Sequence, residues 1–161
     1  MYLMGSSRTR HYHASHVVDE WITGFDRGLR TLTGTHQAAR PNPAEDVAEA
    51  DLTAQERSHV AGLMRVNHTG EVCAQALYEG QALMASDTNA KASLMSAAAE
   101  EQDHLVWCRS RLRELDARPS LLDPVFFGLS FAMGAAAGLM GDRVSLGFVE
   151  ATEDQVVQHL D

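Results

Sequence analysis

Lysine is almost absent from this sequence: Lys91 is the only one among 161 residues, so arginine carries nearly all of the positive charge. Acidic residues outnumber basic ones by 22 to 13, which gives a formal net charge of -9. A general nucleic-acid-binding protein needs a basic surface that neutralises phosphates. The charge balance therefore indicates that nucleic acid is not a partner of this chain.

Cysteine is also scarce, since Cys73 and Cys108 are the only two. They are too few for a disulfide framework and are typical of a reducing compartment. The first residues lack the long apolar segment and the small-residue cleavage site of a secretory signal peptide. Neither a Gly-rich phosphate loop nor a Ser or Cys arrangement for nucleophilic catalysis is present. We expect a flexible leader over residues 1–14 and one domain over residues 15–161.

Helical spacing of apolar residues dominates the start of the domain. Apolar side chains recur every three or four positions over about 15–32, which predicts a helix that Gly34 ends. The following segment, 35–50, contains Pro41 and Pro43. Prolines at this density cannot continue a helix, so we expect an extended polar loop there.

Two long helices are expected in the middle of the chain. Thr53 and Glu56 have the spacing of a capping box, which predicts a helix from there to about residue 86. Asp87 or Thr88 is expected to cap the next helix, which runs to about residue 116. A last helix is expected from Asp142 to the end of the chain.

An uncharged apolar run covers residues 125–141 and is about three residues short of the roughly 20 that span a bilayer. Its alanines, with Gly134 and Gly138, let another helix approach closely. The run could pack within the protein or against a twin subunit, and it could dip into a membrane surface; these two roles can coexist. If this run is a helix, the sequence predicts five helices and no convincing strand. This pattern predicts an all-α helical bundle.

Two polar residues interrupt the apolar stripe of the helix predicted before residue 116. Glu101 and His104 are three positions apart, so both side chains point the same way from a helix. An ionised carboxylate on a core face is costly unless a partner offsets its charge, and a metal ion does so. On a solvated helix face the same spacing carries no meaning, so this motif alone leaves both interpretations open.

Glu71, in the preceding helix, and Glu150, in the last one, are further acids that could face the same core. Glu71 alone is more often an exposed helix acid, and Glu150 shares an acidic stretch with Glu153. Together with Glu101 and His104 they offer carboxylates from three helices and one imidazole. This donor set suits iron or manganese rather than structural zinc, which prefers thiolates.

The spacing of these residues matches one half of a di-metal site. In ferritin-like di-iron proteins, two helices each give one Glu and two others each give a Glu-x-x-His motif. Glu71 and the Glu101-x-x-His104 motif, 30 residues later, form one such half. The same interval after Glu150 would place the second motif beyond residue 161. We therefore expect the bundle to be incomplete, with one helix missing at its C-terminal end.

Four stretches resemble the demethoxyubiquinone hydroxylase family of ubiquinone biosynthesis in its bacterial form. They are MRVNHTGEVCAQALY over 64–78, EEQDH over 100–104, RPSLL over 118–122 and GDRVSLGFVE over 141–150. The resemblance covers nearly everything but the leader. It implies a ferritin-like bundle with two iron ions, which hydroxylates the ring of a polyprenyl demethoxybenzoquinone with dioxygen as co-substrate.

Carried over residue by residue, the resemblance makes Glu71 and His104 ligands of the first iron. It makes Glu101 a bridging ligand and Glu150 a ligand of the second iron. It also implies a polyprenyl quinone substrate and a peripheral position on the cytoplasmic face of the cell inner membrane. A homo-oligomer is compatible with it, because the apolar run could pack against a second copy.

Two other functions remain open on the residues alone. A ferritin-like metal store without hydroxylase activity would use the same ligands, but its exterior should be charged throughout, and the apolar run over 125–141 speaks against this. An accessory module that binds quinone or lipid without metal would leave Glu101 and His104 in need of other partners in the core.

Overall fold

This computed structural model describes residues 19 and 22–160, and side chains as far as residue 151. In that part of the chain there are five helices and no strand. The all-α helical bundle predicted from the sequence is therefore confirmed. The leader predicted over residues 1–14 and the predicted start of the first helix lie outside the described residues.

The two long central helices begin where their capping signals predict. α2 spans Ala54–Met84, and Thr53 and Glu56 form the capping box: each side chain accepts a hydrogen bond from the backbone amide of the other residue. α3 spans Thr88–Glu114, and the Asp87 carboxylate accepts from two amides of its first turn. These caps satisfy amides that a helix start otherwise leaves without a partner.

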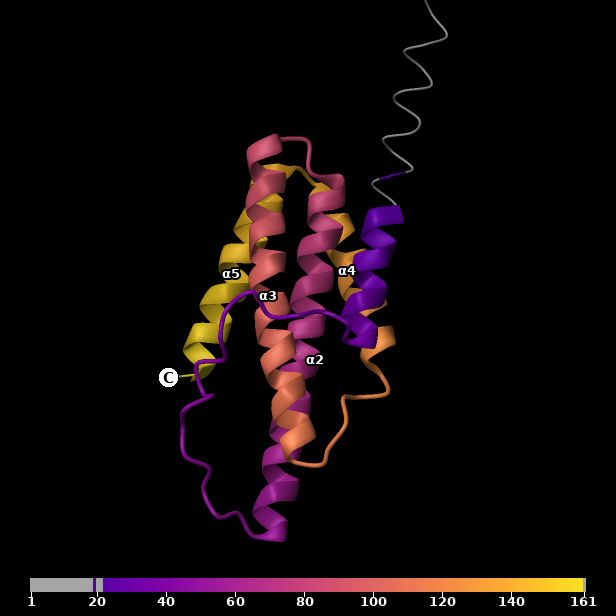
Figure 1. Cartoon of the computed structure of the whole chain (residues 1–161). Helices are drawn as coiled ribbons and strands as arrows, with labels where there is room; N and C mark the ends of the chain where they lie inside the picture. Colours follow the sequence, from indigo (N-terminus) through magenta and orange to yellow (C-terminus); the bar gives the residue numbers. More distant parts are fainter. Residues whose placement is uncertain (1–18, 20–21, 161) are drawn as a thin grey trace, which may run out of the picture.

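A shorter helix over residues 22–33, called helix 22–33 below, precedes them and ends at Gly34, whose φ is +72°. A β-carbon at Gly34 would lie 1.1 Å from Nη1 of Arg109, so both the backbone conformation and the space require glycine. The predicted extended loop follows and crosses α3 (Figure 1). There the Arg40 guanidinium donates to the Asp103 carboxylate at 2.6 Å.

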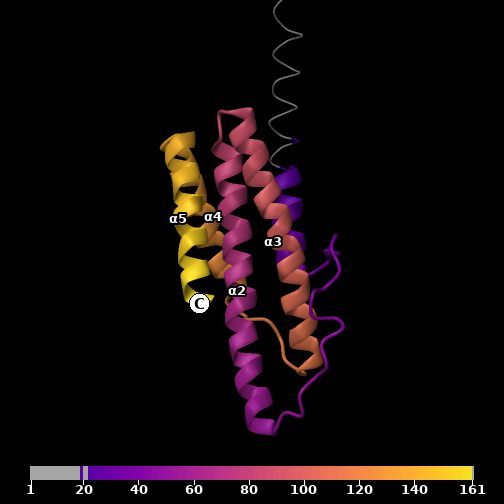
Figure 2. The same cartoon turned by 90° about the vertical axis from the view of Figure 1, so that its left-hand side faces the viewer.

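α4 spans Asp123–Leu139 and α5 spans Asp142–Leu160. Figure 2 shows α2 between α3 on one side and α4 with α5 on the other. The core cluster lies between α2 and α3, and Val149 of α5 packs against it. This cluster consists of Leu77, Tyr78, Ala82, Leu94 and Ala98. The side chains of α2 and α3 that face each other therefore build both the core and, further along, the candidate site.

The start of α5 is tied to the turn between α2 and α3. The Asp142 carboxylate accepts from the Ser86 hydroxyl at 2.6 Å and from the Asp87 amide at 2.9 Å. One turn later, the Gln81 side-chain amide donates to the Ser145 carbonyl oxygen at 2.8 Å. These bonds hold the first turn of α5 against the end of α2.

The apolar run of the sequence becomes α4, whose small residues face α2. Several of its large apolar side chains point outward, with exposed fractions of 57% for Val125, 65% for Leu129 and 52% for Met133. In the part of the chain that the structure describes, no helix is both long enough and apolar enough to cross a membrane. α4 packs against α2 and also presents an apolar face to the surroundings.

Candidate metal centre

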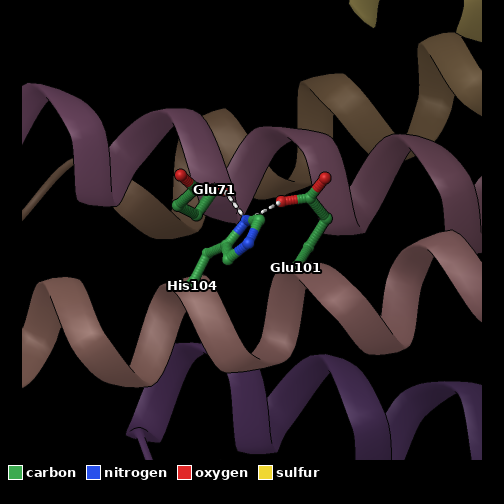
Figure 3. Close-up of side chains that lie close together, drawn as sticks. All are labelled: Glu71, Glu101 and His104. Atoms are coloured by element: carbon green, nitrogen blue, oxygen red, sulfur yellow. Dashed lines mark hydrogen bonds and ion pairs between the residues drawn. The ribbon is translucent and has the colours of Figure 1, made fainter. Parts of the chain in front are cut away.

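Glu71, Glu101 and His104 come together between α2 and α3 (Figure 3). Each offers one ligand atom, and these atoms lie within 4.8 Å of one another. The Nδ1 atom of His104 lies 3.2 Å from a carboxylate oxygen of Glu101 and 3.8 Å from one of Glu71. The structure thus brings together three of the four predicted ligands, and their role as ligands stays a prediction.

Local helix geometry explains how the three residues meet. Glu101 and His104 are one turn apart on α3 and face α2, from which Glu71 reaches across. The His104 ring also lies against Trp107, with ring centroids 5.3 Å apart, and this contact limits its rotation. The side chains are 24%, 18% and 41% exposed for Glu71, Glu101 and His104, so the group is partly shielded and still open to small molecules.

The electrostatics of the group favour a bound cation. Burial raises the pKa of Glu71 to about 9, and the hydrogen bond with Glu101 and the charge of Glu101 add to the shift. Burial and the neighbouring Glu71 also raise the pKa of the Cys108 thiol to about 11. Two carboxylates held this close repel each other when both are ionised, and a metal ion between them offsets that repulsion. Carboxylates with one imidazole therefore fit iron.

The fourth predicted ligand, Glu150, is not brought to this group. It lies on α5 with an exposed side chain, and Glu153 falls where side chains are not described. Among the described side chains, the group Glu71, Glu101 and His104 is the one cluster with metal-binding geometry. The position of Glu150 as a ligand of a second ion thus stays a prediction.

A buried polar network beside the candidate centre has no local signal in the sequence. His68 is fully buried, one turn before Glu71, with its Nδ1 3.1 Å from a carboxylate oxygen of Asp123. The Arg109 guanidinium donates to the other ring nitrogen at 3.4 Å, and the Thr69 hydroxyl donates to Asp123 at 2.7 Å. The network joins α2, α3 and α4, so it fixes the helices that position the candidate ligands.

Burial keeps the His68 imidazole neutral, because desolvation is the main cause that lowers its pKa and the Arg109 charge lowers it further, against the opposing pull of Asp123. A neutral ring that accepts from Arg109 at Nε2 carries its proton at Nδ1, on the side of Asp123. The His68 ring therefore lies between the Arg109 guanidinium and the Asp123 carboxylate.

Glu79, like Asp123, is a buried acid that the sequence does not predict to be buried. It lies two turns after Glu71 on α2, is 3% exposed, and burial raises its pKa to about 7 although Arg27 and Gln75 oppose the shift. Glu71, Gln75 and Glu79 follow one another at intervals of four residues and so lie along one side of the helix. This spacing is the one sequence signal that could have identified Glu79.

Comparison with known proteins shows sequence similarity to one protein family. The family described as "Ubiquinone biosynthesis protein COQ7" matches residues 58–161. The chain is 58% identical to the 3-demethoxyubiquinol 3-hydroxylase of Burkholderia cenocepacia over 146 residues, which are 90% of this chain and 70% of the relative. It is 54% identical to the protein of that name from Pseudomonas aeruginosa over 156 residues, covering 96% of this chain and 71% of the relative.

A third relative with the same name, from Acinetobacter baylyi, is 58% identical over 152 residues, covering 94% of this chain and 70% of the relative. No solved structure matches the chain significantly. The family match covers more than half of the chain, and the three relatives are more than half identical to it. The chain belongs to the COQ7 family of ubiquinone biosynthesis proteins.

Proposed function

We propose that this chain is a di-iron monooxygenase of ferritin-like architecture that hydroxylates the ring of demethoxyubiquinol with dioxygen. The observation that carries the proposal is the group Glu71, Glu101 and His104, a carboxylate and imidazole donor set on facing helices. The relatives named 3-demethoxyubiquinol 3-hydroxylase support the substrate and the reaction. A metal store without hydroxylase activity is disfavoured by the same relatives.

In this proposal Glu71 and His104 would hold the first iron ion, Glu101 would be shared by both ions, and Glu150 would hold the second. Iron bound there would supply the activation of dioxygen. The residues of the chain balance the charge of the ions, and the contact with Trp107 orients the His104 ring.

The overall reaction sets what else must reach the site. One atom of dioxygen replaces hydrogen at a ring carbon as a hydroxyl group, and the other atom leaves as water. This balance needs two electrons and two protons, which we propose come from a donor outside the chain.

We further propose that the protein works at the cytoplasmic face of the cell inner membrane, as a peripheral protein. A polyprenyl tail keeps the quinol in the bilayer, so the enzyme must meet it there. The exposed apolar side chains of α4 and of helix 22–33 support this position, including Phe25, which is 71% exposed. The alternative is that a second copy of the chain covers these exposed apolar side chains.

The test is Glu101→Ala in the full chain, loaded with ferrous iron under anaerobic conditions. We expect the substitution to lower bound iron to a small fraction of the unaltered protein and to reduce hydroxylation more than a hundredfold. Glu114→Ala removes an exposed acid from the same helix and serves as the matched control. Product is measured by mass spectrometry after addition of demethoxyubiquinol, reductant and oxygen. Retained turnover in Glu101→Ala would refute the ligand assignment, and iron uptake without product would favour the metal store.

A further inference from the structure

A second candidate site lies on α2, two turns beyond Glu71. A cavity of about 590 Å³ opens between helix 22–33, the second half of α2, the start of α3 and the middle of α4. None of the three residues of the candidate metal centre lines it. Glu79, which lines the cavity, is eight positions after Glu71, and this corresponds to about 12 Å along the helix.

Glu79 provides a buried polar group in this cavity. One of its carboxylate oxygens lies 3.5 Å from the Arg27 guanidinium and 3.5 Å from the Gln75 side-chain amide. The other oxygen, Oε2, is buried and has no hydrogen-bond partner. A buried acceptor without a donor is costly, so the cavity lacks one hydrogen-bond donor at this point.

The walls around this acceptor are apolar and partly aromatic. Phe127 and Phe131 of α4 lie nearly parallel on one wall, with ring centroids 6.3 Å apart and planes at 15°. On the side of helix 22–33, Phe25 and Leu29 line the cavity and are 71% and 45% exposed. An apolar path therefore leads from the surface of the molecule to the Glu79 carboxylate.

We infer that this cavity binds a hydroquinone that carries a hydrocarbon tail, at a site separate from the candidate metal centre. A ring hydroxyl donates to Oε2 of Glu79, the ring lies beside Phe127 and Phe131, and the tail leaves across Phe25 and Leu29. The inference rests on the proposed function, which makes a prenylated quinol the molecule that this chain handles. A ring held at Glu79 is too far from Glu71 to react, so the site holds a quinol before or after reaction.

The hydroxyl contact is tested with two probes, a geranylated methoxyhydroquinone and its dimethyl ether, which lacks the donors. Binding is measured by calorimetry on the full, metal-free chain under anaerobic conditions. We expect the hydroquinone to bind at least about tenfold more tightly than the ether at pH 8, above the pKa of about 7 to which burial raises Glu79, because a hydrogen bond to a buried ionised carboxylate is strong. Equal affinities in the unaltered protein would overturn the inference.

Glu79→Leu should abolish the difference between the two probes, and Glu45→Leu, in an exposed loop, should keep it. Leucine suits an apolar cavity, and circular dichroism and thermal unfolding check that the variant is folded. A preference for the hydroquinone that survives in folded Glu79→Leu would also overturn the inference, since the donor would then have another acceptor.

The location is tested by placing a photoreactive diazirine on the tail of the hydroquinone probe. Cross-links are expected on helix 22–33 and near Met95, and Met95→Trp should block them by filling the cavity. Leu63→Trp, at an exposed position outside the cavity, is the control. Cross-links confined to the neighbourhood of Glu71, or none at all, would overturn the inference.

These outcomes are separable from those of the proposed function. An iron-loaded protein that hydroxylates demethoxyubiquinol but shows no probe in this cavity overturns the inference alone. A protein that binds the probe here and yields no hydroxylated product contradicts the proposed function alone.

Discussion

The backbone of α4 at Gly134 lies directly against the carbonyl oxygen of Leu77 in α2, so closely that a β-carbon at Gly134 would be 2.1 Å from that oxygen. The contact is repeated where Gly80 of α2 meets the carbonyl oxygen of Phe131, at 2.3 Å from a built β-carbon. Such distances are far below van der Waals contact. At these two contacts the helices therefore pack backbone against backbone, with no room for a side chain.

Gly134→Ala should destabilise the protein because the methyl group can be accommodated only if α4 moves away from α2. We expect the free energy of unfolding to fall by about 2–3 kcal/mol or more, although alanine is the better helix former. Urea unfolding followed by circular dichroism measures the change. Gly128→Ala is the matched control in the same helix, where a β-carbon would meet nothing within 4 Å, and it should leave stability equal or slightly higher.

Asp123→Ala should be strongly destabilising because it leaves Arg109 buried without the carboxylate on the far side of His68. The substitution also leaves the Thr69 hydroxyl and Nδ1 of His68 without their acceptor, and each buried polar group left without a partner costs about 1–3 kcal/mol. Adding Arg109→Met should recover part of this loss, because it removes the remaining charge and keeps an apolar side chain of similar length. Chemical unfolding of the single and double variants provides the measurement. Strictly additive losses would show that the two residues are not coupled.

The buried carboxyl of Glu79 predicts a specific dependence of stability on pH. Its pKa is raised from 4.5 to about 7 in the folded protein, so the folded state keeps a proton that the unfolded state has already released. The free energy of unfolding should therefore fall as pH rises from about 4.5 to 7 and change no further through this group above that range. The total contribution is on the order of 3 kcal/mol.

Glu79→Gln removes this titration and isolates its effect. The stability of the variant relative to the unaltered protein should increase with pH across that window, as measured by thermal or urea unfolding at several pH values. Parallel curves for the two proteins would show that Glu79 does not titrate in this range.

The exposed apolar face of α4 predicts how the protein attaches to vesicles. Leu129→Gln with Met133→Gln should weaken flotation with liposomes of anionic and zwitterionic phospholipids severalfold, because two exposed apolar side chains are lost from the contact. The free energy of unfolding should change by less than about 0.5 kcal/mol, since both side chains are exposed. Ala99→Gln, exposed on α3, is the control for a new surface amide. Unchanged flotation of the double variant would exclude this face from membrane attachment.

The parts of the fold that depend on short-range sequence signals could be predicted. Thr53 with Glu56 marks the start of α2, and Asp87 marks the start of α3, because capping involves residues only a few positions apart. Glu101 and His104 share a face because their spacing matches one helical turn. The common direction of these two side chains is therefore a property of α3 alone.

What depends on the packing of distant helices could not be predicted. Glu79 resembles any exposed helix acid until helix 22–33 and α4 enclose it, and these segments are about 50 residues away in opposite directions along the chain. The same holds for Asp123 and Arg109, which meet only through His68. The alanines and glycines of the run that became α4 predicted a close helix contact, but not that α2 would be the partner.

α4 places its smallest residues against α2, while Val125, Leu129 and Met133 lie exposed on its outer face. The contacts that hold the bundle together and the surface that meets the surroundings therefore involve separate sets of atoms. Polar substitutions on the outer face should therefore give a more soluble variant of the same bundle, suited to crystallisation and spectroscopy. Every contact between α2 and α4 would be left in place.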